Sequence, residues 1–407
     1  MIGIEKIGFY PGTLSLDIGE LCRARGLDTD NFCRRLYCDE RSVVGPYEDV
    51  VTLAVNAADP LLTPADREAI GLVIVGSESG VDQEKPISSW VHRFLGLRSD
   101  CRNFEIKHAC YGGTAAMQMA VAWITANPSP RRKALVISAD HALIGLRGVQ
   151  EPVLGAGAAA VLLSAEPALL AYDPGWSGVY AHEVADIFRP APGVETGDAD
   201  ESLMSYLDAT EECFAAYVER VGTPVDFDAF FAANIYHVPF GGLAERAHLR
   251  LARAQLGLDR AGATAHFARK AGASLTYNRR TGGIYGASTF LALLGLIDGS
   301  PHLKSGDRIG IYSYGSGSCA EFYSGVLLPT SRPVAAGARI GEALDARRKL
   351  SVAEYEACEE ALNRLLCARE FVPDSGLMPD LYAEQYEGRH RLVLRGIHDY
   401  FRTYEWS

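Results

Sequence analysis

The sequence predicts an α/β protein built around a buried, mixed β-sheet. Residues 69–76 (Ala-Ile-Gly-Leu-Val-Ile-Val-Gly) form a continuous, β-branched apolar run, which is typical of a strand buried on both faces. Runs of this kind alternate along the chain with helix-like segments such as residues 47–59 and 114–126. The 41 glycines often stand where a strand would meet a helix. This alternation favours helices packed against the faces of one buried sheet.

The first half of the chain supplies several strand candidates. The segment at residues 133–138 is apolar and β-branched, and a Gly-Ala-Gly-Ala sequence at residues 155–158 predicts a turn before the next strand. The strands expected in this half are residues 1–6, 69–76, 104–107, 133–138 and 157–163.

The second half repeats this order weakly. Strands are expected at residues 230–237, 308–314 and 319–326, the last two joined by Gly-Ser-Gly-Ser. Both halves would then hold a strand, a turn of alternating glycine and small residues, and another strand. Residues 183–200 are rich in Pro, Gly and acids and could be a linker, although residues 186–190 favour an ordered loop that lines something. The remainder is expected to be helical at residues 334–370 and to end in an aromatic docking tail at residues 371–407.

Composition excludes several classes of protein. The formal net charge of −12 over 407 residues argues against general nucleic-acid binding. No apolar run reaches membrane-spanning length, and the first residues lack the features of a signal peptide. Nine cysteines without a CxxC pair indicate a reducing compartment, so we expect a cytoplasmic protein. Arginine groups near Arg34 and Arg246 are, on their own, typical of solvated helix faces.

Cys110 is the first candidate for chemistry. It lies in His-Ala-Cys-Tyr-Gly-Gly, between the strand ending at residue 107 and the helix at 114–126. A single cysteine is more often an inert packing residue. This position, however, places a thiol at a helix N-terminus, where the dipole and free N–H groups favour the thiolate. The pattern predicts a nucleophile for acyl transfer through a thioester.

Other polar residues follow predicted strands in the same way. Glu78 stands between small residues directly after the strand at 69–76, where a half-buried carboxyl would have a raised pKa and could exchange protons. His237 follows the strand at 230–237 and is held by a Pro-Phe-Gly-Gly loop. Asn278 could donate its amide to a carbonyl or orient the histidine, and Ser316 could offer a backbone N–H to an oxyanion. Each alone is weak, but the order Glu, Cys, His, Asn, Gly-Ser-Gly-Ser is specific.

With these motifs the chain resembles the 3-hydroxy-3-methylglutaryl-CoA synthase family of the thiolase superfamily. The resemblance is carried by the Glu78 segment and residues 108–114, 155–158, 184–190, 236–240 and 313–324. It implies a thiolase-like, five-layered αβαβα fold made of two similar halves, residues 1–168 and 169–407, the second with a helical C-terminal extension. It also implies a homodimer.

The resemblance also implies roles for the residues. Cys110 would be the acylated nucleophile, Glu78 the general acid and base, and His237 the anchor of the acceptor substrate. The backbone N–H groups of Cys110 and Ser316 would form the oxyanion hole. Asn278 resembles an acceptor-binding position, although the Gly282-Gly283 step has Gly where Asn is common in the family. Asp186 and Tyr314 lie in shared motifs and are expected at the substrate.

One departure from the family pattern and one resemblance point to the same subgroup of the family. Members acting on free CoA usually carry lysines just after His-Val-Pro-Phe, whereas residues 241–247 here contain none. Residues 47–52 and 241–246 resemble the polyketide β-branching subgroup, whose substrates are held by acyl carrier proteins. Arg34 and Arg246 then become candidate carrier-protein contacts.

The expected reaction begins when an acetyl-loaded donor acyl carrier protein acetylates Cys110. An aldol addition to the β-ketone of a polyketide on an acceptor carrier protein follows, and hydrolysis then releases Cys110. Phosphopantetheine carries the substrates, and no metal or bound organic cofactor is expected.

Three alternatives remain open from the sequence. The first is a primary-metabolic synthase that uses acetyl-CoA and acetoacetyl-CoA. The second is a ketoacyl synthase III-like enzyme, which needs Cys110, His237 and Asn278 but no carboxylate at Glu78. The third is a non-enzymatic partner that binds carrier proteins, in which Cys110 would stay unmodified.

Overall fold

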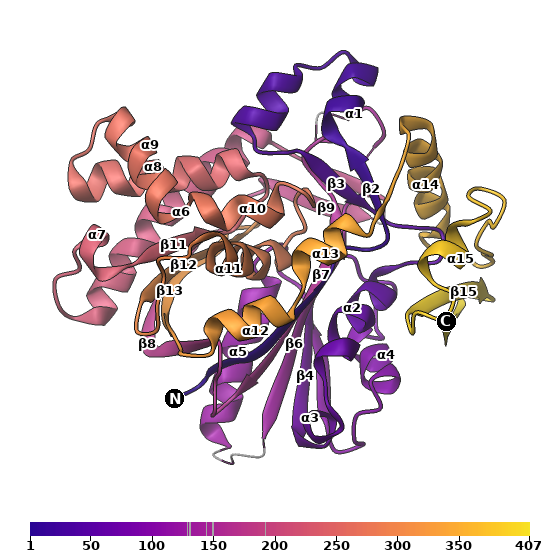
Figure 1. Cartoon of the computed structure of the whole chain (residues 1–407), viewed down its shortest axis with the longest axis horizontal. Helices are drawn as coiled ribbons and strands as arrows, with labels where there is room; N and C mark the ends of the chain where they lie inside the picture. Colours follow the sequence, from indigo (N-terminus) through magenta and orange to yellow (C-terminus); the bar gives the residue numbers. More distant parts are fainter. Residues whose placement is uncertain (128, 130–131, 144, 149, 192) are drawn as a thin grey trace.

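The computed structural model describes residues 1–127, 129, 132–143, 145–148, 150–191 and 193–407 and contains a nine-stranded mixed sheet (Figure 1). Its strands are β1 (Gly3–Tyr10), β4 (Ile70–Gly76), β5 (Arg102–Ile106), β6 (Lys133–His141), β7 (Ala156–Ser164), β8 (Leu170–Ala181), β11 (Ala233–Tyr236), β12 (Arg308–Gly315) and β13 (Cys319–Leu327). Across the sheet the order is β11-β12-β13-β8-β1-β7-β6-β4-β5.

The sheet consists of two similar halves that meet where β1 pairs with β8. In the first half β4 runs parallel to β5 and β6, and β7 is antiparallel to β6 and β1. In the second half β11 runs parallel to β12, and β13 is antiparallel to β12 and β8. At the junction Gly3 pairs with Ala171 and Ile4 with Leu170. The shared pattern agrees with the fold that the family resemblance implies.

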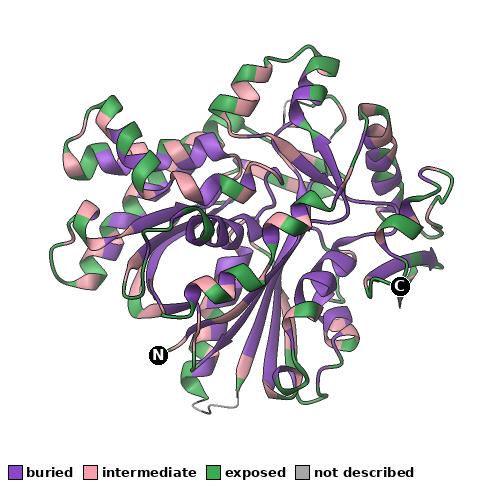
Figure 2. Ribbon diagram, in the orientation of Figure 1, coloured by how far each residue is buried: buried purple, intermediate pink, exposed green. Residues whose placement is uncertain are grey.

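The two halves of the sheet form two of five layers. Helices form the other three, one between the halves and one on the outer face of each. The central helices are α5 (Gly112–Ala126), which contacts β4 and β6, and α11 (Ala287–Gly299), which contacts strands of both halves. Residues 287–297 of α11 are all buried, so this helix has apolar neighbours on every side (Figure 2). The outer layers are α2 (Val50–Ala58) with α4 (Ile87–Phe94) on one half, and α6 (Ala199–Val221) with α8 (Gly241–Leu256) on the other.

The remaining elements lie around this framework. The other helices are α1 (Ile18–Arg25), α3 (Pro64–Ala69), α7 (Phe227–Phe230), α9 (Arg260–Lys270), α10 (Leu275–Asn278), α12 (Ser331–Gly337), α13 (Ile340–Asp345), α14 (Val352–Leu365) and α15 (Leu381–Gln385), with the short helices η1 (Asn31–Arg35), η2 (Asp59–Leu61) and η3 (Gly272–Ser274). The other strands are β2 (Leu14–Asp17), β3 (Glu40–Val43), β9 (Ile187–Ala191), β10 (Val194–Gly197), β14 (Arg348–Lys349), β15 (Leu392–His398) and β16 (Phe401–Trp406). None of the helices in these ranges is both long and apolar enough to span a bilayer.

Most predicted elements are confirmed, and two are wrong. Residues 155–158 are not a turn, because Ala156 begins β7 and this strand pairs with both β6 and β1. A Cβ at Gly157 would lie 3.3 Å from the Phe9 ring, so the small residues there let an aromatic ring on β1 pack closely. The strand expected from residue 230 begins only at Ala233, because the Asp226 side chain caps α7.

Two segments whose structure the sequence left open form β-hairpins. The acidic stretch at residues 183–200 is no open linker, because it holds the hairpin of β9 and β10. The aromatic tail forms the hairpin of β15 and β16, which packs against α2. There Arg402 and the Tyr404 hydroxyl both donate to the buried Asp49 Oδ2, at 2.8 and 2.7 Å.

Candidate active site

Cys110 lies in a tight loop between β5 and α5, and three glycines clamp this loop. A Cβ at Gly76 would lie 2.5 Å from the carbonyl carbon of Gly112. At Gly315 it would lie 2.6 Å from the His108 oxygen, and at Gly286 2.9 Å from the Cys110 oxygen. Three elements therefore touch the loop backbone directly, because their glycines leave no side chain in the way.

The carboxyl of Glu78 lies beside this thiol. Its Oε1 is 3.9 Å from Cys110 Sγ, within reach of a weak S–H donor. Burial raises the pKa of the Cys110 thiol well above its usual range, and the Glu78 charge adds to this effect. Burial and the neighbouring carboxylates therefore favour the protonated thiol at Cys110, contrary to the expectation of a thiolate.

The loop that carries Glu78 is held by two charged groups, Asp140 and Arg189, for which the sequence predicted no role. Asp140 Oδ1 accepts the Glu78 backbone N–H at 2.9 Å, and Arg189 donates to the Glu78 carbonyl at 2.9 Å. Burial and then the Asp140 charge raise the pKa of Glu78 well above its usual range, whereas Arg189 lowers it. The raised pKa predicted for Glu78 agrees with these surroundings. Asp140 stands near the end of the apolar run of β6, but nothing local in the sequence connects it with Glu78.

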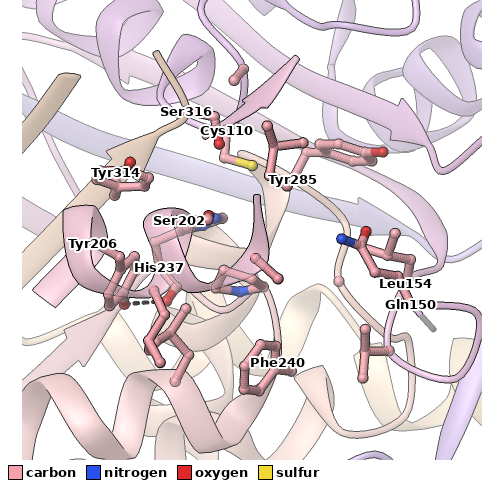
Figure 3. A pocket seen from close by; sticks show the side chains of 18 of the residues that line it. Cys110, Gln150, Leu154, Ser202, Tyr206, His237, Phe240, Tyr285, Tyr314 and Ser316 are labelled. Carbon is pink, nitrogen blue, oxygen red and sulfur yellow. Dashed lines mark hydrogen bonds between the residues drawn. The ribbon is translucent and has the colours of Figure 1, made fainter. Parts of the chain in front are cut away.

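His237 is held firmly at the end of β11. Its backbone N–H donates to the Tyr312 carbonyl at 2.7 Å, and its carbonyl accepts the Tyr206 hydroxyl at 2.7 Å. Ring atom Nδ1 lies 2.9 Å from Ser288 Oγ, while Nε2 is buried and has no hydrogen-bond partner among the described residues. Burial lowers the pKa of this imidazole to about 3, so the ring is neutral. Figure 3 shows His237 and Cys110 around the same cavity.

The buried side chain of Asp186 holds the Gly-Ser-Gly-Ser turn by hydrogen bonds. Its Oδ1 accepts the Gly317 N–H and its Oδ2 accepts the Tyr314 hydroxyl, both at 2.8 Å. Tyr314 and Ser316 line the cavity with Cys110 (Figure 3). Asp186 is fully buried and is not part of the cavity wall, so it meets the site through the turn.

Asn278 also lies outside the cavity wall. Its side-chain Nδ2 donates to the Ser288 carbonyl at 3.0 Å, which places it behind His237. The two candidate arginines differ in their relation to the cavity. Arg246 on α8 lines the cavity, and Arg34 projects from η1 with 83% of its side chain exposed. Asn31 of the same short helix contributes to the wall.

The cavity itself has a volume of about 410 Å³ and a largely apolar wall. Tyr206 on α6 also lines this wall, and the sequence did not predict it there because a tyrosine on a half-buried helix looks like ordinary core. Within the described ranges, no group of three or more His, Cys, Asp or Glu side chains is arranged to hold a metal ion. Arg189 and Phe240, from the motifs at 184–190 and 236–240, line the wall as well, and the wall residues that the sequence did not indicate include Phe32, Leu154, Glu195, Tyr206 and Tyr285.

Comparison with known proteins adds to this geometry. The sequence models described as hydroxymethylglutaryl-coenzyme A synthase N terminal and C terminal match residues 1–168 and 258–402. The chain is 40% identical to the polyketide biosynthesis 3-hydroxy-3-methylglutaryl-ACP synthase PksG of Bacillus subtilis (strain 168), over 99% of both chains. It is 35% identical to the hydroxymethylglutaryl-CoA synthase of Enterococcus faecalis, over 88% of this chain and 91% of that one.

Solved structures give the same picture. The HMG synthase of the curacin biosynthetic pathway, in complex with holo donor-ACP, is 40% identical and superposes with a TM-score of 0.95 over 100% of both chains. The same synthase with acetyl donor-ACP gives a TM-score of 0.94. MvaS in complex with 3-hydroxy-3-methylglutaryl coenzyme A is 33% identical, with a TM-score of 0.90 over 100% of this chain and 99% of that one.

Proposed function

This chain belongs to the hydroxymethylglutaryl-CoA synthase family, and from that membership we propose how its cavity performs β-branching on carrier-bound substrates. The enzyme is a carbon–carbon bond-forming acyltransferase whose substrates are held on the phosphopantetheine of acyl carrier proteins. An acetyl unit is added to the β-ketone of a polyketide intermediate. The roles of the individual residues below are our assignment.

The first step loads Cys110. Glu78 takes the thiol proton across the 3.9 Å gap, and the sulfur attacks the acetyl thioester of the donor carrier protein. The phosphopantetheine sulfur leaves and takes up a proton. The backbone N–H groups of Cys110 and Ser316 stabilise the oxyanion that forms on the acetyl carbonyl. The turn bearing Ser316 is preorganised for this by the hydrogen bond from Gly317 to Asp186.

The second step forms the new bond. Ionised Glu78 removes a proton from the acetyl methyl group, and the same N–H groups hold the enolate oxygen. The enolate carbon attacks the β-ketone of the acceptor, which His237 binds and polarises. The resulting alkoxide is protonated to a tertiary alcohol, and water hydrolyses the Cys110 thioester to complete the cycle.

One observation carries this assignment, namely the 3.9 Å contact between the Glu78 carboxyl and the Cys110 sulfur within one cavity. A ketoacyl synthase III-like enzyme needs no carboxylate at that place. We therefore expect Glu78→Gln to acetylate Cys110 more slowly, because the base of the loading step is gone, and to lose condensation altogether. Intact-mass measurement follows the first step, and product release from the carrier follows the second. Condensation that survives in Glu78→Gln would instead support the ketoacyl synthase III-like reading.

Carrier proteins are favoured over free CoA because residues 241–247 contain no lysine and Arg246 lines the cavity. Acetyl and acetoacetyl groups presented on carrier proteins should react faster than the same groups on CoA. The reverse preference would show a primary-metabolic synthase. An unmodified Cys110 after incubation with acetyl-carrier protein would show a non-catalytic binding partner.

The carrier surface is tested separately by charge reversal. Arg246→Glu should raise KM for the acidic carrier substrates and leave acetylation by acetyl-pantetheine unchanged. Arg253→Glu is the matched control, because Arg253 lies on the same helix, is exposed and lies outside the cavity wall. Equal KM changes in both variants would mean that Arg246 acts only through net charge.

A further inference from the structure

The hydrogen bonds of Ser288 near His237 restrict where the imidazole proton can lie. Ser288 is the second residue of α11 and is fully buried. Its Oγ accepts the backbone N–H of Val238 at 3.1 Å and lies 2.9 Å from His237 Nδ1. The contact with Val238 uses a lone pair of the oxygen, so the single hydrogen of this hydroxyl still needs an acceptor.

Within the described part of the chain, the acceptor that the contacts provide is His237 Nδ1. If Nδ1 carried the ring proton instead, two hydrogens would face each other, or the hydroxyl hydrogen would stay buried without a partner. An unpaired buried donor is costly, so the serine favours a bare Nδ1. A neutral imidazole with a bare Nδ1 carries its proton on Nε2. Nε2 is the ring nitrogen for which the described residues offer no hydrogen-bond partner.

We propose that Ser288 is a positioning residue that holds His237 as the Nε2–H tautomer, so that the ring donates a hydrogen bond to the ketone oxygen of the acceptor. This inference rests on the proposed function and adds which atom acts and what sets it. The opposite tautomer would point a lone pair at the ketone oxygen, and it could not stabilise the charge that develops there.

Asn278 has a place in this arrangement. Its amide donates to the Ser288 carbonyl at 3.0 Å and helps to hold the first turn of α11. On the other side of the Ser288–His237 contact, the Tyr206 hydroxyl donates to the His237 carbonyl and holds the histidine. Asn278 then affects the acceptor step through Ser288 and His237, without contact to the substrate.

The two steps of the reaction separate this role from a structural one. In Ser288→Ala, acetylation of Cys110 by acetyl-carrier protein should stay close to wild type, since His237 acts only on the acceptor. Condensation with acetoacetyl-carrier protein should lose kcat by about tenfold or more, because the hydrogen bond to the ketone is no longer enforced. The thiol of Ser288→Cys is a weaker donor of similar shape, so the condensation kcat of this variant should lie between those of the wild type and Ser288→Ala.

Thr289→Val is the matched control. Thr289 is the next residue on α11, is buried, and its hydroxyl has no hydrogen-bond partner among the described residues. Removing that hydroxyl should leave both steps unchanged. Equal loss of acetylation and condensation in Ser288→Ala, or the same loss in Thr289→Val, would reduce Ser288 to a packing residue and overturn the proposal.

Nitrogen NMR tests the tautomer without any turnover. Two-bond ¹H–¹⁵N spectra of protein labelled at its 10 histidines, with His237→Gln to assign the signal, should show Nε2–H for His237 in the wild type. Ser288→Ala should mix the two tautomers. An Nδ1–H pattern in the wild type would overturn the proposal, even if Cys110 is acetylated as expected. Failure of acetylation with an Nε2–H signal would instead reject the proposed function alone.

Discussion

Asp140 Oδ1 accepts the backbone N–H of Glu78 at 2.9 Å, so one buried carboxylate builds the loop that carries another. The hydroxyls of Ser77 and Ser79 donate to the same oxygen, at 3.1 and 2.8 Å. Burial raises the pKa of Asp140 itself to about 7. Each ionised carboxyl opposes ionisation of the other, so the two titrate as a pair. Asp140 thus both holds the loop of Glu78 in place and raises the pKa of the Glu78 carboxyl.

Replacing that charge should move the pH dependence of condensation. Glu78 has to be ionised to take the methyl proton, so the rate rises with pH as this carboxyl titrates. Asp140→Asn keeps an oxygen for the loop N–H groups and removes the charge that raises the pKa of Glu78. We expect the rising limb of the condensation rate to move to lower pH. An unchanged limb, or one displaced to higher pH, would contradict the coupling.

The oxyanion turn should depend on Asp186 in both steps. Asp186→Ala frees the Gly317 N–H and the Tyr314 hydroxyl, so the Ser316 N–H beside them loses its fixed direction. We expect acetylation and condensation both to slow by about 10- to 100-fold, less than the loss of an oxyanion donor outright. Tyr314→Phe is the milder control, because the bond to Gly317 stays. Loss of condensation alone in Asp186→Ala would show that the residue serves the acceptor instead.

The strands that the sequence predicted best are those buried on both faces. The run at 69–76 is continuous and apolar because helices cover both sides of β4, and its length limits it to a strand. The Gly-Ala alternation at 155–158 misled because two causes give the same pattern. Small residues mark turns, but on β7 they make room for the close approach of Phe9.

Glu78, Cys110 and His237 were identifiable because all three lie in short loops that follow strands. Their supports were not, because Asp140 and Ser288 come from elements 62 and 51 residues away in the chain. No local pattern reports such a contact. The protonation of Cys110 was mispredicted for a related reason, since the helix dipole is local but burial depends on the whole fold.

The C-terminal hairpin should stabilise the first half of the fold. Arg402 pairs with the buried Asp49 at 2.8 Å, and both side chains are nearly inaccessible. Arg402→Ala leaves that carboxylate with fewer partners and should lower the free energy of unfolding by about 3 kcal/mol. Arg395→Ala is the control on the same hairpin. Its pair with Glu405 is about half exposed, so it should cost less than about 1 kcal/mol. Equal losses in urea unfolding would argue against the buried pair.

A buried histidine pair should weaken the protein in acid. His248 bonds the Tyr236 hydroxyl at 3.0 Å and His266 at 2.7 Å, and His266 reaches Asp228 at 3.1 Å. Burial lowers the pKa of His248 to about 3 from its ordinary 6.5. Below pH 6.5 the unfolded chain gains a proton that the folded ring refuses, so this stabilisation is present above pH 6.5 and falls as the pH drops toward 3.

Glu78 and Asp140 have raised pKa values, so their contribution to the free energy of unfolding changes with pH in the opposite direction to that of His248. Comparison with His248→Asn removes their contribution, because both proteins contain these two carboxyls. Between pH 6.5 and pH 5 the unfolding free energy of the wild type should fall relative to that of the variant by about 2 kcal/mol. Urea unfolding of both proteins at the two pH values measures this difference directly. A constant difference would mean that His248 is protonated in the folded state, which two facing imidazoles 2.7 Å apart allow only if His266 stays neutral.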